Sequence, residues 1–304
     1  KPLITHNIIE NRITENSITN YLYSGGVNTL EGLYGELNSQ IPGSITEYKN
    51  NKIIKNINLK TNYKNPQNKT GSIQEFNSIF SNALNDQLNA EVPVNILLSG
   101  GVDSSLVALF AKKHLNRNVT AYSLGYENEI YNESNEAEKI SNELDINLVK
   151  FNFPQNQNEF IIDEVINKLP EPIADPSIIP TYYLSKRVSE FTKVVITGDG
   201  ADELFGGYEW YRGALISKYI PNSISPLLNL ISKIKTQQKD YISHQDKIRL
   251  LSIANHLPMS LKVMLWQNYI PSEKLDKQIL FYKNYVNKLK FNENLDINDL
   301  RLFE

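Results

Sequence analysis

Two glycine-containing stretches carry the residues whose types and spacing suggest chemistry. The first, residues 95–115, reads NILLSGGVDSSLVALFAKKHL, so an apolar run leads into Gly100 and Gly101 and then into an aspartate among serines. Adjacent glycines allow backbone angles and close approaches that a Cβ atom would block. A helix that begins directly after them presents unpaired amides and the positive end of its dipole to the loop. The turn therefore predicts a cradle for a phosphate or pyrophosphate group.

Asp103 lies inside this expected anion site, where a carboxylate would repel a phosphate. A divalent cation between the two would remove the conflict, because hard cations prefer carboxylate and phosphate oxygens. The competing interpretation is an ordinary strand-to-helix turn with Asp103 as the helix cap. Ser-Gly-Gly-x-Asp-Ser between an apolar strand and an amphipathic helix is more specific than a bare Gly-Gly turn and favours the ligand site. Neither a Walker P-loop nor the dinucleotide pattern G-x-G-x-x-G occurs in the chain.

The other stretch, residues 193–212, reads KVVITGDGADELFGGYEWYR and places three carboxylates after a β-branched strand: Asp199, Asp202 and Glu203. Clustered acids repel one another and are costly when partly buried, unless a cation or strong donors compensate. A solvated acidic surface is the alternative interpretation. Acids between glycines at the end of a parallel strand favour a ligand site, in which Asp202 and Asp103 would complete a divalent-cation site on the bound phosphates.

Strands and helices must position these loops, and from about residue 72 the two alternate regularly. Strands are expected at residues 94–98, 120–126, 147–153 and 193–197. The intervening helices align these apolar groups: Phe76, Ile79, Phe80 and Leu84; Val107, Phe110, Ala111 and His114; Ala137, Ile140 and Leu144; Ile162, Val165, Ile166 and Leu169. The alternation predicts an α/β fold, a parallel sheet with helices on both faces. Ligands of such sheets bind at the carboxyl ends of the strands, where both glycine loops fall.

The remainder of the chain has a different character at each end. Residues 1–70 contain a hairpin pattern around Asn50-Asn51 and a polar, turn-rich linker, NYKNPQNKTGS. From residue 214 the sequence is mostly helical in pattern. We therefore expect a small β-containing segment at residues 1–70 and a larger domain at residues 71–304, made of an α/β core (71–213) and a helical extension (214–304).

Composition restricts the possible functions. The formal charge of −3 gives no electrostatic reason to expect nucleic acid as a partner. The chain has no cysteine, which excludes disulfides, Cys-ligated metals and a cysteine nucleophile within these 304 residues. No stretch approaches the ~20 apolar residues of a membrane span, and no secretory signal is apparent. A cytoplasmic protein without a membrane partner is expected.

Residues 95–115 resemble the pyrophosphate loop of the PP-loop ATP pyrophosphatases, and residues 193–212 resemble part of the synthetase domain of asparagine synthetase. Two further segments, YSLGYENEIYNESNEAEKIS and LPEPIADPSIIPTYYLSK, are similar to other parts of that domain, in the same order. The resemblance spans residues from about 72 to 213. It implies that ATP and Mg²⁺ serve to adenylate a carboxylate. Ammonia from glutamine then displaces AMP to form an amide, converting aspartate to asparagine.

The resemblance also assigns roles by position. Asp199 corresponds to the acidic residue associated with forming the acyl-adenylate, and Asp103 and Asp202 would bind Mg²⁺. The groups that would hold the adenosine and the phosphates are Leu98, Ser99, Gly100, Gly101, Asp103, Ser104, Leu124, Thr197 and Gly198. For Leu98 and Leu124 a sheet-core role is equally consistent, because only their main chains need to touch the ligand. Glu133 and Asp175 are candidates at the edge of the site, although Asp175 before a proline also fits a turn.

The resemblance leaves several alternatives open. Residues ~17–60 are similar to the last part of the glutaminase domain that precedes the synthetase domain in this family, and no match to the family's catalytic lysine motif is found. We therefore expect a fragment that lacks most of the glutaminase domain and the carboxyl-terminal end. The acceptor could instead be a sugar uronate or another carboxylate of secondary metabolism. A different class of function, a non-catalytic nucleotide-binding domain, is disfavoured because Ser99, Asp103, Asp199 and Asp202 are all present.

Overall fold

The computed structural model describes residues 6, 8–10, 12–26, 32–35, 37, 40, 44–50, 52–58, 71–126, 132–154, 158–232, 244–254, 257–267, 277 and 279–284. The chain divides into two compact units. We call Asn68–Leu169 with Asp175–Leu204 the sheet unit, and Lys1–Gln67 with Pro170–Ala174 and Phe205–Glu304 the hairpin–helix unit. The first break along the chain thus falls close to the boundary expected at residue 70. The division into a glutaminase remnant and a synthetase domain stays a prediction.

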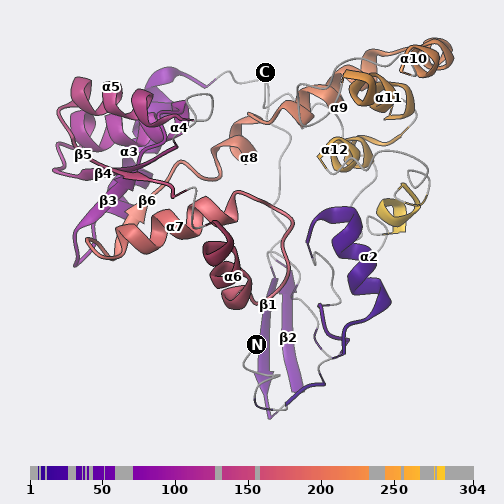
Figure 1. The fold of residues 1–304 in the computed structure, drawn as a ribbon, viewed down its shortest axis with the longest axis horizontal. Coiled ribbons are helices and arrows are strands. Elements are labelled where there is room, and N and C mark those ends of the chain that lie inside the picture. Colours follow the sequence, from indigo (N-terminus) through magenta and orange to yellow (C-terminus); the bar gives the residue numbers. More distant parts are fainter. Residues whose placement is uncertain are drawn as a thin grey trace. The chain divides into compact units, whose positions relative to one another are not determined.

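The sheet unit contains a four-stranded parallel sheet of order β5-β4-β3-β6 (Figure 1). Its strands are β3 (Val94–Leu97), β4 (Thr120–Gly125), β5 (Asn147–Asn152) and β6 (Val194–Ile196). The helices between them are α3 (Ile73–Leu88), α4 (Val102–Leu109) with the π-helical turn η1 (Phe110–His114), α5 (Ser134–Leu144), α6 (Asn158–Lys168) and α7 (Ile178–Val188). This arrangement confirms the α/β fold with a parallel sheet, and each expected strand is present within one or two residues of its expected ends.

Helices cover both faces of the sheet. On one face, α3, α4 and α5 pack over β3 and β4 around a core that includes Ile96, Leu98, Ala121 and Ala137. On the other face, α6 and α7 contribute to smaller clusters with β4 and β5. Because both faces are covered, the strands are apolar along most of their length, as parallel strands usually are.

Two of the expected helical faces are shifted. Ile79 of α3 is 63% exposed and Ile166 of α6 is 61% exposed, although the sequence pattern groups both with buried neighbours. In α6, Val165 and Leu169 pack inward as expected, and Ile161 joins them while Ile166 remains exposed. Both helices are richer in apolar residues than the sheet can cover, and packing selects only part of each apolar face.

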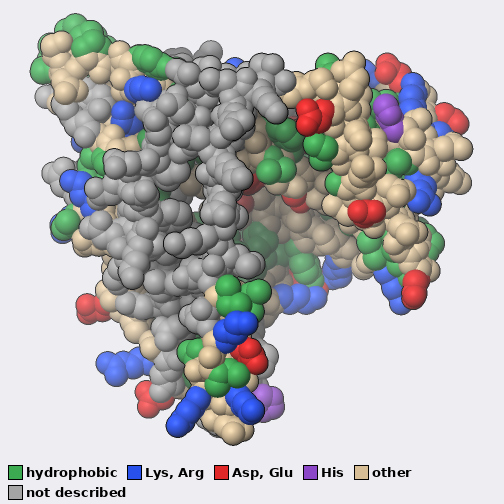
Figure 2. All heavy atoms as spheres, turned by 180° about the vertical axis from the view of Figure 1, so that it is seen from behind, with side chains coloured by type: hydrophobic (Ala, Val, Ile, Leu, Met, Phe, Trp, Pro, Cys, Tyr) green, Lys and Arg blue, Asp and Glu red, His purple; other side chains and the backbone are tan. Residues whose placement is uncertain are grey.

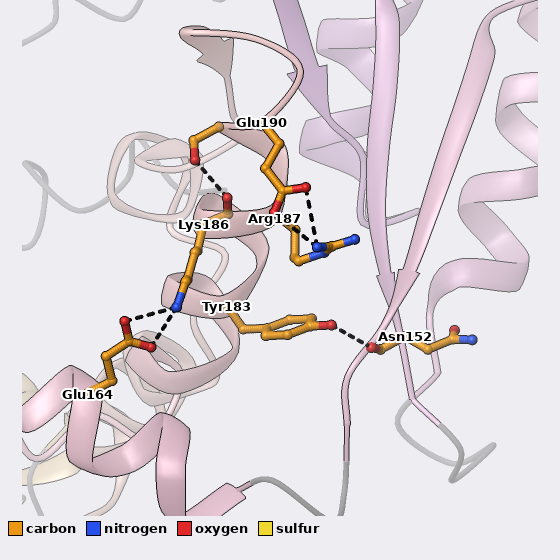
Figure 3. Close-up of polar contacts among 7 residues, drawn as sticks. Asn152, Glu164, Tyr183, Lys186, Arg187 and Glu190 are labelled. Atoms are coloured by element: carbon orange, nitrogen blue, oxygen red, sulfur yellow. Dashed lines mark hydrogen bonds and ion pairs between the residues drawn. The ribbon is translucent and has the colours of Figure 1, made fainter.

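Contacts between α6 and α7 fasten the second face of the sheet (Figure 3). The ammonium group of Lys186 donates to both carboxylate oxygens of Glu164, at 2.9 and 2.8 Å. This hydrogen bond is the largest cause that lowers the pKa of the Glu164 carboxyl. The Tyr183 hydroxyl donates to the backbone oxygen of Asn152 at 3.2 Å. That bond ties α7 to the carboxyl end of β5, the edge of the sheet where the glycine loops lie.

The hairpin–helix unit contains the expected hairpin. Strands β1 (Ser44–Lys49) and β2 (Lys52–Asn58) pair antiparallel on either side of Asn50, which has a φ of +51°. The unit also holds α2 (Glu15–Ser24), α9 (Glu209–Tyr219), η4 (Asn222–Ile224), α10 (Ser225–Ile231), α11 (His244–Ala254) and α12 (Met259–Gln267), while α8 (Ala201–Phe205) crosses from the sheet unit into it. The mostly helical pattern expected after residue 214 is thus confirmed for the described residues.

Helices α9 and α12 meet at Gly213. A Cβ atom there would lie 2.5 Å from the Trp266 ring, and the indole Nε1 donates to the Ser217 hydroxyl at 3.1 Å. Leu227 and Leu230 of α10 are by contrast exposed. Figure 2 shows a group of hydrophobic (green) side chains at its upper left. In the part of the chain that the structure describes, no helix is both long and apolar enough to cross a membrane.

Lys262 of α12 is expected to destabilise the hairpin–helix unit. Its side chain is buried (5% exposed), and burial, followed by the nearby charge of Lys218, lowers the pKa of its ammonium group. Replacing it with methionine, which keeps the apolar stem, should raise the free energy of unfolding at pH 7 by about 1–2 kcal/mol, measured by denaturant unfolding.

The effect of Lys262 should depend on pH in a defined direction. The folded chain binds the proton less tightly than the unfolded chain, so wild-type stability rises between the lowered pKa and the ordinary lysine value of about 10.4. The advantage of Lys262→Met over the wild type should therefore shrink as the pH rises through that window. Lys218→Met, which removes only the neighbouring charge, should give a smaller gain. A pH-independent gain would contradict the electrostatic explanation.

Candidate functional site at the carboxyl edge of the sheet

The first glycine loop connects β3 to α4. Gly100 has a φ of +92°, a left-handed conformation that favours glycine. Helix α4 begins at Val102, directly after the two glycines, with Gly101 at the N-cap position and no side-chain cap. Asp103 therefore lies in the first turn of α4 and does not cap it. This disagrees with the alternative in which Asp103 is present as the helix cap.

Hydrogen bonds of serine hydroxyl groups hold this loop together. The Ser104 hydroxyl donates to the Gly101 carbonyl at 3.2 Å, accepts from the Ser99 amide at 3.2 Å and lies 3.0 Å from the Ser99 hydroxyl. The Gly101 amide donates to the Ser99 hydroxyl at 3.1 Å, and the Ser105 hydroxyl donates to the Gly101 carbonyl at 2.6 Å. The hydroxyls of Ser99 and Ser104 are rotatable donors, so they can be redirected toward an anion at the start of α4.

The second glycine loop connects β6 to α8 and fixes a carboxylate. The Thr197 hydroxyl donates to Oδ2 of Asp199 at 2.9 Å and accepts from the Asp199 amide at 3.3 Å. The Asp199 side chain is exposed, and Gly200 follows it with a φ of +90°. Thr197 thus holds the carboxylate of Asp199 in one orientation at the open edge of the sheet.

The two loops touch each other. Strands β3 and β6 are parallel neighbours, with Ile96 opposite Ile196, so both loops leave the same edge. A Cβ atom at Gly198 would lie 2.8 Å from the Ser104 amide nitrogen, a distance that real Cβ atoms essentially never show, and 3.0 Å from Cβ of Asp103, which is also unusually short. Gly198 therefore packs directly against the first turn of α4. The expected convergence of the two loops is present.

The acids of the two loops fit a magnesium ion only together with a ligand. Asp103 and Asp202 are both half-buried, and Asp202 lies in the first turn of α8. No group of three or more His, Cys, Asp or Glu side chains that could hold a metal is found among the described residues. Mg²⁺ in nucleotide sites usually takes one or two carboxylates and completes its shell with phosphate oxygens and water. The donor set fits that pattern, and the assignment of Asp103 and Asp202 to Mg²⁺ stays a prediction.

The remaining predicted residues are more dispersed. Leu98 is buried and its amide donates to the Tyr122 carbonyl at 2.8 Å, while the Leu124 side chain packs in two core clusters. Their side chains therefore belong to the sheet core. The Asp175 carboxylate accepts from the Ser177 amide at 2.9 Å, the turn before α7 that its neighbouring proline suggests.

Glu133 lies immediately before α5, and its carbonyl accepts from the amides of Glu136 and Ala137, both at 3.1 Å. Its side chain is exposed. Burial, and after it the charge of Glu133, raises the pKa of the Tyr126 hydroxyl. Glu133 therefore lies near the end of β4, at the same edge of the sheet as the glycine loops.

A polar cluster at the ends of β4 and β5 was not foreseen. A Cβ atom at Gly125 would lie 2.9 Å from Oδ1 of Asn152 and 3.1 Å from Oγ of Ser134. The Ser134 hydroxyl donates to Oδ1 of Asn132 at 2.7 Å. The rule that ligands bind at the carboxyl ends of parallel strands could have drawn attention to these residues, since β4 and β5 end here. Small polar residues in an asparagine-rich chain gave no separate signal.

Comparison with known proteins gives the chain a family. The asparagine synthase family model matches residues 75–283. The chain is 28% identical over 256 residues to asparagine synthetase (glutamine-hydrolyzing) 1 of Bacillus subtilis, covering 80% of this chain and 38% of that protein. It is 30% identical over 162 residues to a putative asparagine synthetase (glutamine-hydrolyzing) of Mycobacterium tuberculosis, covering 52% of this chain and 25% of that protein.

Among solved structures, an NH3-dependent NAD synthetase from Campylobacter jejuni matches 73% of this chain and 96% of its own, with 19% identity and a TM-score of 0.35. The two curated relatives extend well beyond the matched region, since the chain spans 38% and 25% of their lengths. The family match includes both glycine loops and most of the helices after them. Because that match covers well over half of its residues, the chain belongs to the asparagine synthase family.

Proposed function

We propose that this chain is the ATP-using part of an amide-forming ligase that activates a carboxylate as its adenylate. The observation that carries the proposal is the packing of Gly198 against Asp103 and Ser104, because it joins two loops suited to phosphates and carboxylates at one edge of the sheet. Membership of the asparagine synthase family supports it. Since the curated relatives are named as glutamine-hydrolysing asparagine synthetases, aspartate is the proposed acceptor and glutamine the proposed source of ammonia.

The first loop would bind the phosphates. The start of α4, the amides of Gly100 and Gly101 and the hydroxyls of Ser99 and Ser104 converge there, and each favours negative charge. The main chain at Leu98, Leu124, Thr197 and Gly198 would line the adenosine. Since a carboxylate is a poor electrophile, its oxygen must first attack the α-phosphate, and alignment with charge stabilisation is the main contribution that a protein can make to such a step.

The carboxylates have separate proposed roles. Asp103 and Asp202 would hold Mg²⁺, which when bound neutralises the charge of the phosphates. Asp199 would act in forming the adenylate. Its orientation is set by the Thr197 hydroxyl, and its exposed carboxylate is free to meet an acceptor or the α-phosphate. Proximity to the reacting groups is the contribution proposed for it.

Exchange of labelled pyrophosphate into ATP tests this function. We expect exchange that requires a carboxylate acceptor, and the comparison of aspartate with sugar uronates identifies which acceptor class is used. Binding of ATP without exchange with any carboxylate would instead support a non-catalytic nucleotide-binding domain. No binding of ATP at all would contradict the proposal.

Asp199→Asn should lower the exchange rate by about 100-fold or more, because a charge placed at the reacting centre is removed. Binding of ATP should change little, since the phosphate loop is untouched. Asp163→Asn is a matched control, because Asp163 is an exposed aspartate of α6 and lies outside both glycine loops. Equal effects of the two substitutions would contradict the role given to Asp199.

A further inference from the structure

Small residues line both sides of the contact between α5 and β4. The buried face of α5 consists of Ser134, Ala137, Ser141 and Leu144, so three of its four inward positions are small. The facing side of β4 carries Ala121, Ser123 and Gly125, which alternate along the strand and therefore point to one side of the sheet. Ala121 shares a core cluster with Ala137, and Gly125 lies against Ser134, so the two small faces meet.

Residue size, and not hydrogen bonding, explains which residues occupy this contact. The Ser123 side chain is 1% exposed, and its hydroxyl has no hydrogen-bond partner in the described part of the chain. A buried hydroxyl without a partner is unfavourable, so bonding does not explain a serine at this position. A small side chain allows α5 to lie closer to the sheet than the larger apolar residues of a typical helix–sheet contact would permit.

The close approach of α5 brings its first turn against the phosphate loop. A Cβ atom at Gly100 would lie 2.8 Å from the Ala137 amide nitrogen, 2.8 Å from Cβ of Glu136 and 3.0 Å from the Glu133 carbonyl oxygen. Two features therefore disfavour any residue other than glycine at position 100: its φ of +92° and the close contact with α5. The backbone of α5 forms the rear wall of the loop on the side away from the second glycine loop.

We propose that Ala137 is a positioning residue for phosphate binding, because its methyl-sized side chain sets how closely α5 supports Gly100 and Gly101. This inference rests on the proposed function and adds the element that holds the loop in shape. Ala137 is fully buried, and the Gly100 side of the loop already touches its amide nitrogen. A larger side chain at position 137 would move α5 away from β4, and the loop would then lose its contact with the backbone of α5.

A larger side chain at position 137 should weaken the binding of the phosphates and leave the binding of adenosine unchanged. Gly100 and Gly101 belong to the loop proposed to bind the phosphates, whereas the adenosine is proposed to lie against the main chain at Leu98, Leu124, Thr197 and Gly198. Displacement of a binding loop by about 1 Å is enough to cost about 100-fold in a well-aligned site. A general loss of stability would instead weaken the binding of adenosine and of phosphates together.

The test compares Ala137→Val with Ala111→Val in the full chain. Both alanines are fully buried in the same core cluster, but Ala111 lies in η1, at the far end of α4 from the loop. Binding of Mg²⁺–ATP, of Mg²⁺–pyrophosphate and of adenosine is measured by calorimetry, with the melting temperature of each variant. We expect both variants to melt lower than the wild type. Only Ala137→Val should weaken ATP and pyrophosphate binding, by roughly 10-fold or more, with adenosine binding unchanged.

Equal binding of pyrophosphate by the two variants would overturn the role of Ala137 while leaving the proposed function in place. Failure of the wild-type chain to bind ATP would overturn the proposed function and this inference with it. If Ala137→Val does not fold, Ala137→Ser, which adds a single atom, should show the same order of effects at smaller size. In that case, unchanged pyrophosphate binding in a folded Ala137→Ser overturns the proposal.

Discussion

Gly198→Ala is expected to reduce ATP–pyrophosphate exchange by about 100-fold or more, the largest effect that we expect from adding a single carbon. The added Cβ would lie 2.8 Å from the Ser104 amide nitrogen and 3.0 Å from Cβ of Asp103, so either loop must move away from the other. Both neighbours are parts of α4, which cannot shift as a flexible side chain would. Separation of the loops would remove the common edge on which phosphates, metal and acceptor depend. The measurement is the exchange rate at saturating Mg²⁺ and ATP.

Gly200→Ala provides a matched control two residues away. Gly200 has a φ of +90°, so alanine there strains the backbone by about 1–3 kcal/mol. Nothing lies within 4 Å of a Cβ atom at this position. We therefore expect a lower melting temperature, with exchange activity retained at temperatures where the protein is folded. Gly198→Ala should instead lose exchange activity even at temperatures where the protein is folded. A similar loss of activity in both variants would indicate that backbone strain in the second loop, and not contact between the loops, determines activity.

The sequence predicts that both glycine loops lie at one edge of the sheet, because two local rules point to the same place. Alternating strands and helices imply a parallel sheet, and both glycine loops follow strands that end at its carboxyl edge. In the structure β6 is the direct neighbour of β3, and Gly198 therefore contacts Ser104. No local pattern in either strand specifies that the two strands are neighbours. The residues of the loops were therefore predictable, while their distance from one another was not.

Features that arise from packing were missed for a common reason. The exposure of Ile79 and the packing of Ile161 in place of Ile166 depend on how much surface the sheet can cover. The support of Gly100 by α5 depends on small residues at positions 123 and 137, which a hydrophobicity pattern treats as neutral. Such contacts require three-dimensional complementarity, and helical periodicity does not encode it.

Asp103→Asn and Asp202→Asn are expected to show that their two carboxylates act on one metal ion. Each substitution keeps the size of the side chain and removes its charge. Each should raise the Mg²⁺ concentration needed for half-maximal exchange by about 10-fold or more, because one of the two protein ligands is weakened. The measurement is a Mg²⁺ titration of the exchange rate at fixed ATP.

The double variant separates a shared ion from two independent acids. If Asp103 and Asp202 act separately, their effects on the free energy of activation add; if they hold one ion, the second substitution costs much less than the first. We expect non-additivity, since the loops that carry them touch at Gly198 and no group of three acids or histidines in the described chain could hold a metal without a ligand. Full additivity would place the two carboxylates in different roles.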